Sequence, residues 1–209
     1  VPRQRRGKQE KILGVGIYLI LLNMVFLEWL FFYFAVAAIG TFLSVKQKSP
    51  KNKLIAIHIC LILSILPLNA AGVKLHWEFQ AYALSIFLIS AALCIFLMRR
   101  LSFVYIISSV IQELCLLLAG VLLGQITPVI VAACASSLVY ACAHSIDSRR
   151  WQLILPLTFL WGTFSILLYN LFHQPMLNFA LHIIGGAIFF RLGLIYEGLT
   201  YKPLIYKEN

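Results

Sequence analysis

Three ionisable residues inside apolar stretches are the part of this sequence most suited to chemistry. Glu113 lies near the middle of one apolar run, His144 near the end of the next, and His182 inside a later one. A carboxylate at membrane depth is costly, so an ionisable residue placed there marks a candidate functional site. A carboxylate and two imidazoles can activate a water molecule by general base catalysis or hold a metal ion such as zinc.

Each of these residues also has a purely structural interpretation. Glu113 can be a hydrogen-bonded structural acid, with Gln112 as a donor between helices. His144 lies near the end of its run, where a histidine costs little, and His182 precedes Gly185-Gly186, where another helix can approach closely. The residues alone leave the structural and the catalytic interpretations open.

Composition excludes a soluble domain. The chain has 209 residues, of which 62% are hydrophobic and only 11% charged, whereas soluble domains carry about 25% charged residues. The net charge of +10 comes from basic residues in short links between apolar runs, which is typical of membrane topology and not of nucleic-acid binding. The five cysteines all lie inside apolar runs without a CxxC pair, where free cysteine behaves as a small hydrophobe.

The apolar runs predict an all-α, polytopic bundle of transmembrane helices. The expected runs are 12–45, 54–69, 80–98, 101–123, 129–143, 151–171 and 176–195. One crossing needs about 20 residues, so the run 12–45 is long for one span and short for two. It forms either a tight helical hairpin that turns near Glu28 or a single long, tilted helix.

The distribution of basic residues favours the hairpin and therefore eight spans. With two crossings in the first run, every one of the 17 Lys and Arg residues except Lys74 lies on the side of both termini. Basic residues collect on the cytoplasmic side, so both termini are expected there. The sequence then divides into a basic cytoplasmic flank (1–11), a lipid-embedded helical domain (12–196) and a cytoplasmic tail (197–209), in a bacterial cytoplasmic membrane or an organelle membrane.

Three short motifs follow one another in the second half of the chain. They are Gln112-Glu113-Leu-Cys-Leu-Leu117, Tyr140-Ala-Cys-Ala-His144 and His182-Ile-Ile-Gly-Gly186, with Phe159-Leu-Trp-Gly162 between the last two. Their order and spacing resemble the EExxxR, aromatic-xxx-His and His-xxx-Asn motifs of the CPBP intramembrane proteases, which include CAAX prenyl proteases and bacteriocin-processing proteins. The resemblance covers residues 101–195 and implies eight spans with a site that faces the cytoplasm.

Three positions depart from the family pattern. Gln112 replaces the first acid, Leu117 the arginine and Gly186 the asparagine. The resemblance implies an endopeptidase for membrane-bound peptides or proteins, with Glu113 as base and His144 and His182 as ligands of water or zinc. Because glutamine cannot accept a proton from water, the alternative is an inactive relative that binds other membrane subunits as a scaffold or assembly factor. A small transporter or an immunity protein is a third hypothesis.

Helix geometry makes the meeting of these residues a demanding expectation. At about 1.5 Å per residue, Glu113 lies roughly 18 Å from the cytoplasmic end of its helix, His144 about 7 Å and His182 about 14 Å. A tilt of about 20° does not fully close that gap. Either a helix is broken or shifted and the three converge in one cavity open to the cytoplasm, or the three do not meet. Gln112 and Glu113 also point about 100° apart, so in the family's helix orientation Glu113 faces away from the histidines.

Overall fold

The computed structural model describes residues 14–35 except 19, 22 and 32–33, a few helical residues between 59 and 69, and 72–76, 80–98, 102–145 and 151–191. This part of the chain is helical and contains no strand. Its continuous helices are α3 (Ala81–Met98), α4 (Ser102–Gly124), α5 (Val129–Ser145), α6 (Trp151–Phe172) and α7 (Pro175–Arg191). The predicted all-α class is confirmed, and these helices begin and end close to the predicted runs.

Four helical segments in the described residues are long and apolar enough to cross a membrane. They are Gly14–Phe31, Ala81–Met98, Tyr105–Gly124 and Trp151–Phe172, and two shorter apolar helices accompany them, Val129–His144 and Pro175–Phe189. Large apolar side chains point outward, including Phe96 with 79% and Phe103 with 72% exposure. The molecule thus fits a membrane protein. The predicted flank 1–11, the basic link 46–53 and the tail 197–209 lie outside the described residues.

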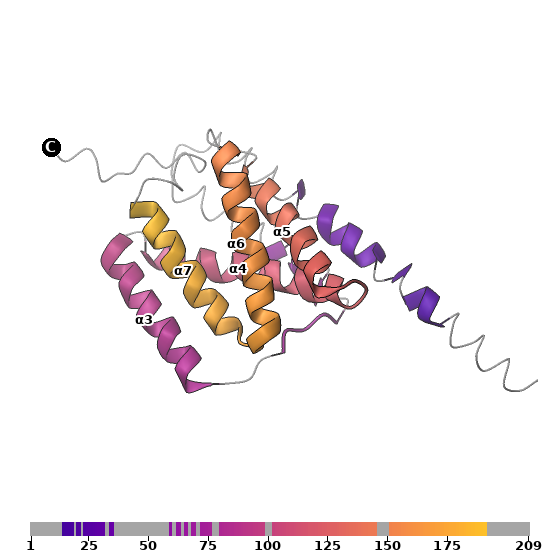
Figure 1. Cartoon of the computed structure of the whole chain (residues 1–209), viewed down its shortest axis with the longest axis horizontal. Helices are drawn as coiled ribbons and strands as arrows, with labels where there is room; N and C mark the ends of the chain where they lie inside the picture. The colour runs from indigo at the N-terminus through magenta and orange to yellow at the C-terminus, as the bar shows by residue number, and fades with distance from the viewer. Residues whose placement is uncertain are drawn as a thin grey trace, which may run out of the picture.

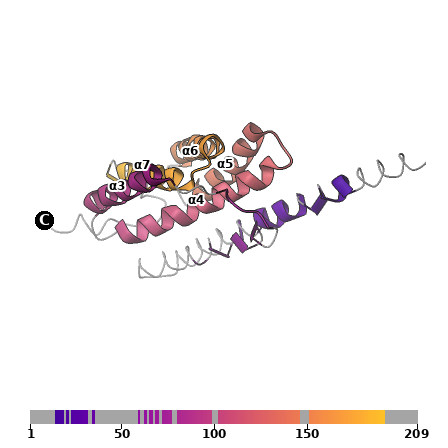
Figure 2. The same ribbon diagram turned by 90° about the horizontal axis from the view of Figure 1, so that it is seen from below.

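Helix α4 is the centre of the bundle. Helix α3 packs mainly on α7 and α5 mainly on α6, while α4 contacts all four of these helices. Figure 1 shows α4 crossing behind α6 and α7, and Figure 2 shows it as a long helix beneath the others. Leu117, Ala119 and Leu122 of α4 are fully buried. Because α4 touches all four of these helices, its side chains can reach groups on each of them.

Small residues let the helices of the second half approach closely. A Cβ atom at Gly162 of α6 would lie 2.8 Å from Ser137 Oγ of α5, and one at Gly120 of α4 would lie 3.0 Å from the Ile166 side chain of α6. Small residues at crossings are how membrane helices gain packing contacts when lipid is as apolar as the side chains. These contacts hold the middle of α6, where the site residues lie, against α4 and α5.

The N-terminal helical segment continues through Glu28. Residues 23–31 are helical, and Trp29, which is 2% exposed, packs in a cluster with Leu118 and Leu122 of α4. Glu28 is exposed on the outer side of the segment. A hairpin that turns at Glu28 is therefore wrong, because an acidic side chain that projects outward leaves the helical backbone hydrogen bonds intact.

The α6–α7 connection closes one end of the bundle, which we call the turn end. His173 takes a positive φ of 51°, and Pro175 begins α7, a position that suits the missing amide hydrogen of proline. The His76 amide donates to the Tyr169 hydroxyl at 2.8 Å, so the segment 72–76 is attached here. The opposite end, where Met98, Ser145, Trp151 and Arg191 terminate their helices, is the loop end.

Candidate functional site

A buried carboxylate–imidazole pair joins α4 to α7. Glu113 Oε2 accepts a hydrogen bond from His182 Nδ1 at 2.7 Å, with the glutamate fully buried and the histidine side chain 10% exposed. The other carboxylate oxygen accepts a hydrogen bond from the Ser165 hydroxyl of α6. Three helices therefore meet at one carboxylate, and both its oxygens have donors, which buried charges need.

Asn178 supports this pair from one turn earlier on α7. Its side-chain nitrogen donates to the Ser165 carbonyl at 2.6 Å and to Ser165 Oγ at 2.7 Å. Because Oγ already accepts from Asn178, its single proton is directed to Glu113. The order Asn178–Ser165–Glu113–His182 is thus a continuous hydrogen-bond network, in which each group fixes the orientation of the next.

His182 has one ring nitrogen bound and one available. With Nδ1 donating to Glu113, the neutral ring carries its lone pair on Nε2, and Nε2 has no hydrogen bond within the described part of the chain. The rings of Tyr140 and Trp161 stand nearly perpendicular to the imidazole, each with its centroid 6.4 Å away. The imidazole is therefore held in place with a basic nitrogen free, a pattern that suits general base catalysis.

His144 forms a second pair, with Gln112. Its Nδ1 donates to the Tyr140 carbonyl at 2.9 Å and its Nε2 lies 3.2 Å from Gln112 Oε1, while Gln112 Nε2 donates to Ser108 Oγ at 2.9 Å. A neutral imidazole that donates from Nδ1 accepts at Nε2. Two acceptors would then face each other, so all three groups are satisfied only when the Gln112 amide is turned by 180°, with its nitrogen facing His144 and its oxygen accepting from Ser108. His144 then has no free nitrogen.

The structure thus brings Glu113 and His182 together and gives His144 a different partner. The neighbouring positions 112 and 113 point about 100° apart, so Gln112 reaches α5 while Glu113 reaches α6 and α7. In the family's helix orientation Glu113 would face away from both histidines. In this structure it faces His182. Tyr140 links the pairs, because its ring also lies 4.1 Å from the His144 ring. Helix α4 lies beneath α6 and α7, from which Ser165 and His182 reach Glu113 (Figure 2).

A zinc ion does not fit these histidines. Both ring nitrogens of His144 are occupied by Tyr140 and Gln112, and Nδ1 of His182 is occupied by Glu113. In the residues that the structure describes, no three His, Cys, Asp or Glu side chains gather into a group that can hold a metal ion. We therefore assign no chemical step to the zinc expected at His144 and His182.

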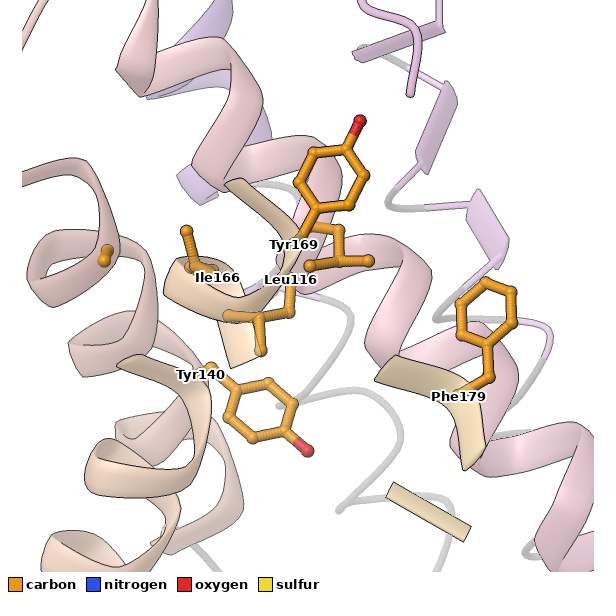
Figure 3. Close-up of a cluster of buried hydrophobic side chains, with 7 residues drawn as sticks. Leu116, Tyr140, Ile166, Tyr169 and Phe179 are labelled. Atoms are coloured by element: carbon orange, nitrogen blue, oxygen red, sulfur yellow. The ribbon is translucent and has the colours of Figure 1, made fainter. Parts of the chain in front are cut away.

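Leu117, at the position of the family's arginine, lies in an apolar cluster. Its neighbours in that cluster are Leu116, Ala133, Tyr140, Ile166, Tyr169 and Phe179. Figure 3 shows the hydroxyls of Tyr140 and Tyr169 pointing to opposite ends of this cluster. An arginine at Leu117 would bury a charge among these side chains, which is expensive without a partner. The cluster separates the histidine pairs from the Tyr169–His76 contact.

Gly186, at the position of the family's asparagine, is covered by a tyrosine. Tyr105 of α4 donates its hydroxyl to the His182 carbonyl at 3.3 Å. A Cβ atom at Gly186 would lie 2.6 Å from Tyr105 Cζ and closer still to the hydroxyl oxygen. The Tyr105 ring therefore fills the space that a side chain at position 186 would need.

Sequence reasoning missed several residues of this site. Ser165 carried no signal as a site residue, because a serine in an apolar helix is common. Trp161 stood in the segment Phe159-Leu-Trp-Gly162 but was not assigned a role in the site. Asn178 did carry one, since it lies four positions before His182 and so on the same helix face.

No protein-family model, no curated protein and no solved structure matches this chain. The likeness to the CPBP proteases therefore rests on the motif positions 112–117, 140–144 and 182–186. Within these motifs, Glu113, His144 and His182 have the residue types of the CPBP motifs that they resemble. Their contacts decide what each of them can do.

Proposed function

We propose that this chain is a CPBP-like intramembrane endopeptidase that cleaves a membrane-bound peptide or protein. The observation that carries the proposal is the 2.7 Å hydrogen bond between the buried Glu113 carboxylate and His182 Nδ1. It assigns the base to His182 Nε2, with Glu113 as the group that orients the ring and stabilises its positive charge. This division of roles differs from the expectation that Glu113 itself takes the proton.

The proposed reaction is the hydrolysis of one peptide bond. His182 Nε2 removes a proton from water as the water oxygen attacks the scissile carbonyl carbon. Glu113 stabilises the imidazolium that forms, as a buried carboxylate does in other histidine-based hydrolases. The imidazolium then gives its proton to the amide nitrogen as the carbon–nitrogen bond breaks, which yields a carboxylic acid and an amine.

The surroundings of the pair support a fixed geometry. Ser165 and Asn178 hold the carboxylate through the hydrogen bonds described above, and the rings of Tyr140 and Trp161 limit rotation of the imidazole. A catalytic group keeps its efficiency only when neighbouring contacts fix it to within about half an ångström. The network is therefore built as a site that operates in one conformation.

A second observation favours an inactive relative that binds other membrane proteins as a scaffold, assembly factor or subunit. Gln112 faces His144 where the family's first acid stands, and the amide leaves His144 without a base. If catalysis in this fold requires a carboxylate beside His144, the natural chain is silent. Stable co-purification with other membrane subunits is then the expected behaviour.

The variant Gln112→Glu distinguishes these two functions. A carboxylate at position 112 still accepts from Ser108 and gives His144 a proton acceptor. If the chain is the proposed endopeptidase, the natural protein in lipid vesicles cleaves a membrane-anchored reporter peptide, and Gln112→Glu changes the rate by less than about tenfold. If it is a scaffold, only the variant cleaves. Gln112→Met, which has no acid, is the control. Absence of cleavage by the natural protein and by both variants contradicts the endopeptidase function.

We further propose eight spans with both termini in the cytoplasm, which requires the run 12–45 to turn beyond the helical segment that passes through Glu28. Lys74, exposed near the turn end, is the one basic residue that this topology places outside. We expect an impermeant thiol reagent added to intact cells to label Lys74→Cys and to leave Ser49→Cys unlabelled until the membrane is opened. The unsubstituted chain gives the background of the native cysteines. Labelling of both positions in intact cells would contradict this topology.

A further inference from the structure

A stripe of buried polar side chains follows one face of α7. Gln174, Asn178 and His182 are four positions apart, so they lie within an arc of about 80° on that face. They are 1%, 1% and 8% exposed. The stripe begins at the turn end and finishes at the Glu113–His182 pair.

The outer half of this stripe lacks hydrogen-bond partners. Both amide atoms of Gln174 and the side-chain oxygen of Asn178 are buried without a partner in the described residues. A buried amide that has lost its hydrogen bonds to water without forming new ones raises the free energy of the folded state. Proteins usually satisfy such groups with internal water, roughly one per 27 residues, each making about three hydrogen bonds. Three unpartnered amide atoms therefore indicate a bound polar molecule.

The spacing of the two amides suits water. Residues four positions apart on a helix are separated by about 6 Å along the axis. One water that makes two hydrogen bonds of about 2.8 Å at a roughly tetrahedral angle joins atoms about 4.5 Å apart, a separation that side chains one helical turn apart can present. Gln174 offers a donor and an acceptor, and Asn178 Oδ1 offers an acceptor, so together they match the two donors and the lone pairs of water.

The hydrogen bonds of Asn178 connect this place to the site. Its nitrogen contacts Ser165, and Ser165 contacts Glu113. At the other extreme, Gln174 adjoins His173, which is exposed at the turn end. We infer that Gln174 and Asn178 form a buried water-binding site that joins the turn end to the Glu113–His182 pair. The further role of this site, supply of the water that peptide hydrolysis consumes, rests on the proposed function.

Thiol labelling tests the water site without any need for activity. We expect Gln174→Cys and Asn178→Cys, in the full chain in vesicles, to react with a small charged methanethiosulfonate reagent at least about tenfold faster than Ala180→Cys. Ala180 is a matched control, because it is fully buried on the same helix but points about 200° away from Asn178. The unsubstituted chain gives the background of the native cysteines. The reagent is added from the turn-end side only.

Reaction of Gln174→Cys and Asn178→Cys as slow as that of Ala180→Cys overturns the site. Fast reaction only from the loop-end side overturns the route. If the cysteine variants do not fold, the melting temperature of Gln174→Leu decides. If Gln174 binds water, the substitution removes those hydrogen bonds and lowers the melting temperature. If Gln174 is buried without water, the substitution removes an unpaired amide and raises the melting temperature, which refutes the inference.

Cleavage by Gln174→Leu separates the two proposals. Supply of water through this site predicts a kcat lower by about tenfold at unchanged KM, because Gln174 lies away from the reacting bond. Fast labelling together with no cleavage by the natural protein refutes the endopeptidase and leaves the water site standing. An active enzyme with slow labelling refutes the water site alone.

Discussion

Under the proposed endopeptidase function, Glu113→Gln is expected to lower the rate of peptide cleavage by about 10²–10⁴-fold, the usual contribution of general acid–base catalysis. The amide has the size of the carboxylate but one acceptor in place of two. If its oxygen keeps the Ser165 hydroxyl, its nitrogen must donate to His182 Nδ1. The ring proton then moves to Nε2, and the lone pair needed as base disappears.

The measurement is cleavage of a membrane-anchored reporter by the purified variant in lipid vesicles. Glu28→Gln is the matched control, since it makes the same chemical change on an exposed helix surface and should leave the rate unaltered. Size-exclusion profiles and melting curves establish that both variants are folded. Full activity in folded Glu113→Gln would mean that Glu113 has only a structural role.

Gly186→Asn is expected to destabilise the protein by about 3 kcal/mol or more, at the upper end of the cost of overpacking. This change introduces the residue type of the CPBP motif, yet its Cβ would lie 2.6 Å from Tyr105 Cζ. Tyr105 cannot withdraw without losing its hydrogen bond to the His182 carbonyl. The family residue should therefore harm this chain where motif logic alone would expect it to improve activity.

Melting curves in detergent measure the stability of Gly186→Asn. A second substitution, at Tyr105, tests whether the clash with that ring is the cause of the loss. Tyr105→Ala combined with Gly186→Asn should be more stable than Gly186→Asn alone, because the deleted ring makes room for the asparagine. Gly124→Ala is the control, since a Cβ there meets nothing within 4 Å. Equal melting temperatures for Gly186→Asn and the natural protein would show that Tyr105 does not fill that space.

The helices α3 to α7 were predictable because their lengths follow from apolar runs that charged or turn residues interrupt. Pro128 and Pro175 mark helix starts, and the predicted limits agree with the structure to within a few residues. The turn expected near Glu28 failed for a physical reason. A single acid interrupts a hydropathy pattern, but it does not break a helix when its side chain can project outward.

The site was predictable only in part. The position of an acid and a histidine inside apolar runs predicted that both belong to a functional site, and Glu113 and His182 do form a hydrogen bond. The partner of His144 was not predictable, because it depends on the rotation of α4 about its axis. Ser165 had no signal, since its role follows from packing between α4 and α6. The relation of Tyr105 to Gly186 needed knowledge of which helices touch.

The wide sequence separation within the Glu113 network has a consequence for biosynthesis. Ser165 lies 52 residues after Glu113 in the sequence, and His182 lies 69 residues after Glu113. At about 5–20 residues per second, the ribosome makes these partners only several seconds after α4 has emerged. An unpaired acid costs roughly 2.5–3.5 kcal/mol at the membrane centre on the insertion scale. If α4 crosses the membrane, we therefore expect it to enter lipid together with α6 and α7, after their side chains can pair with Glu113.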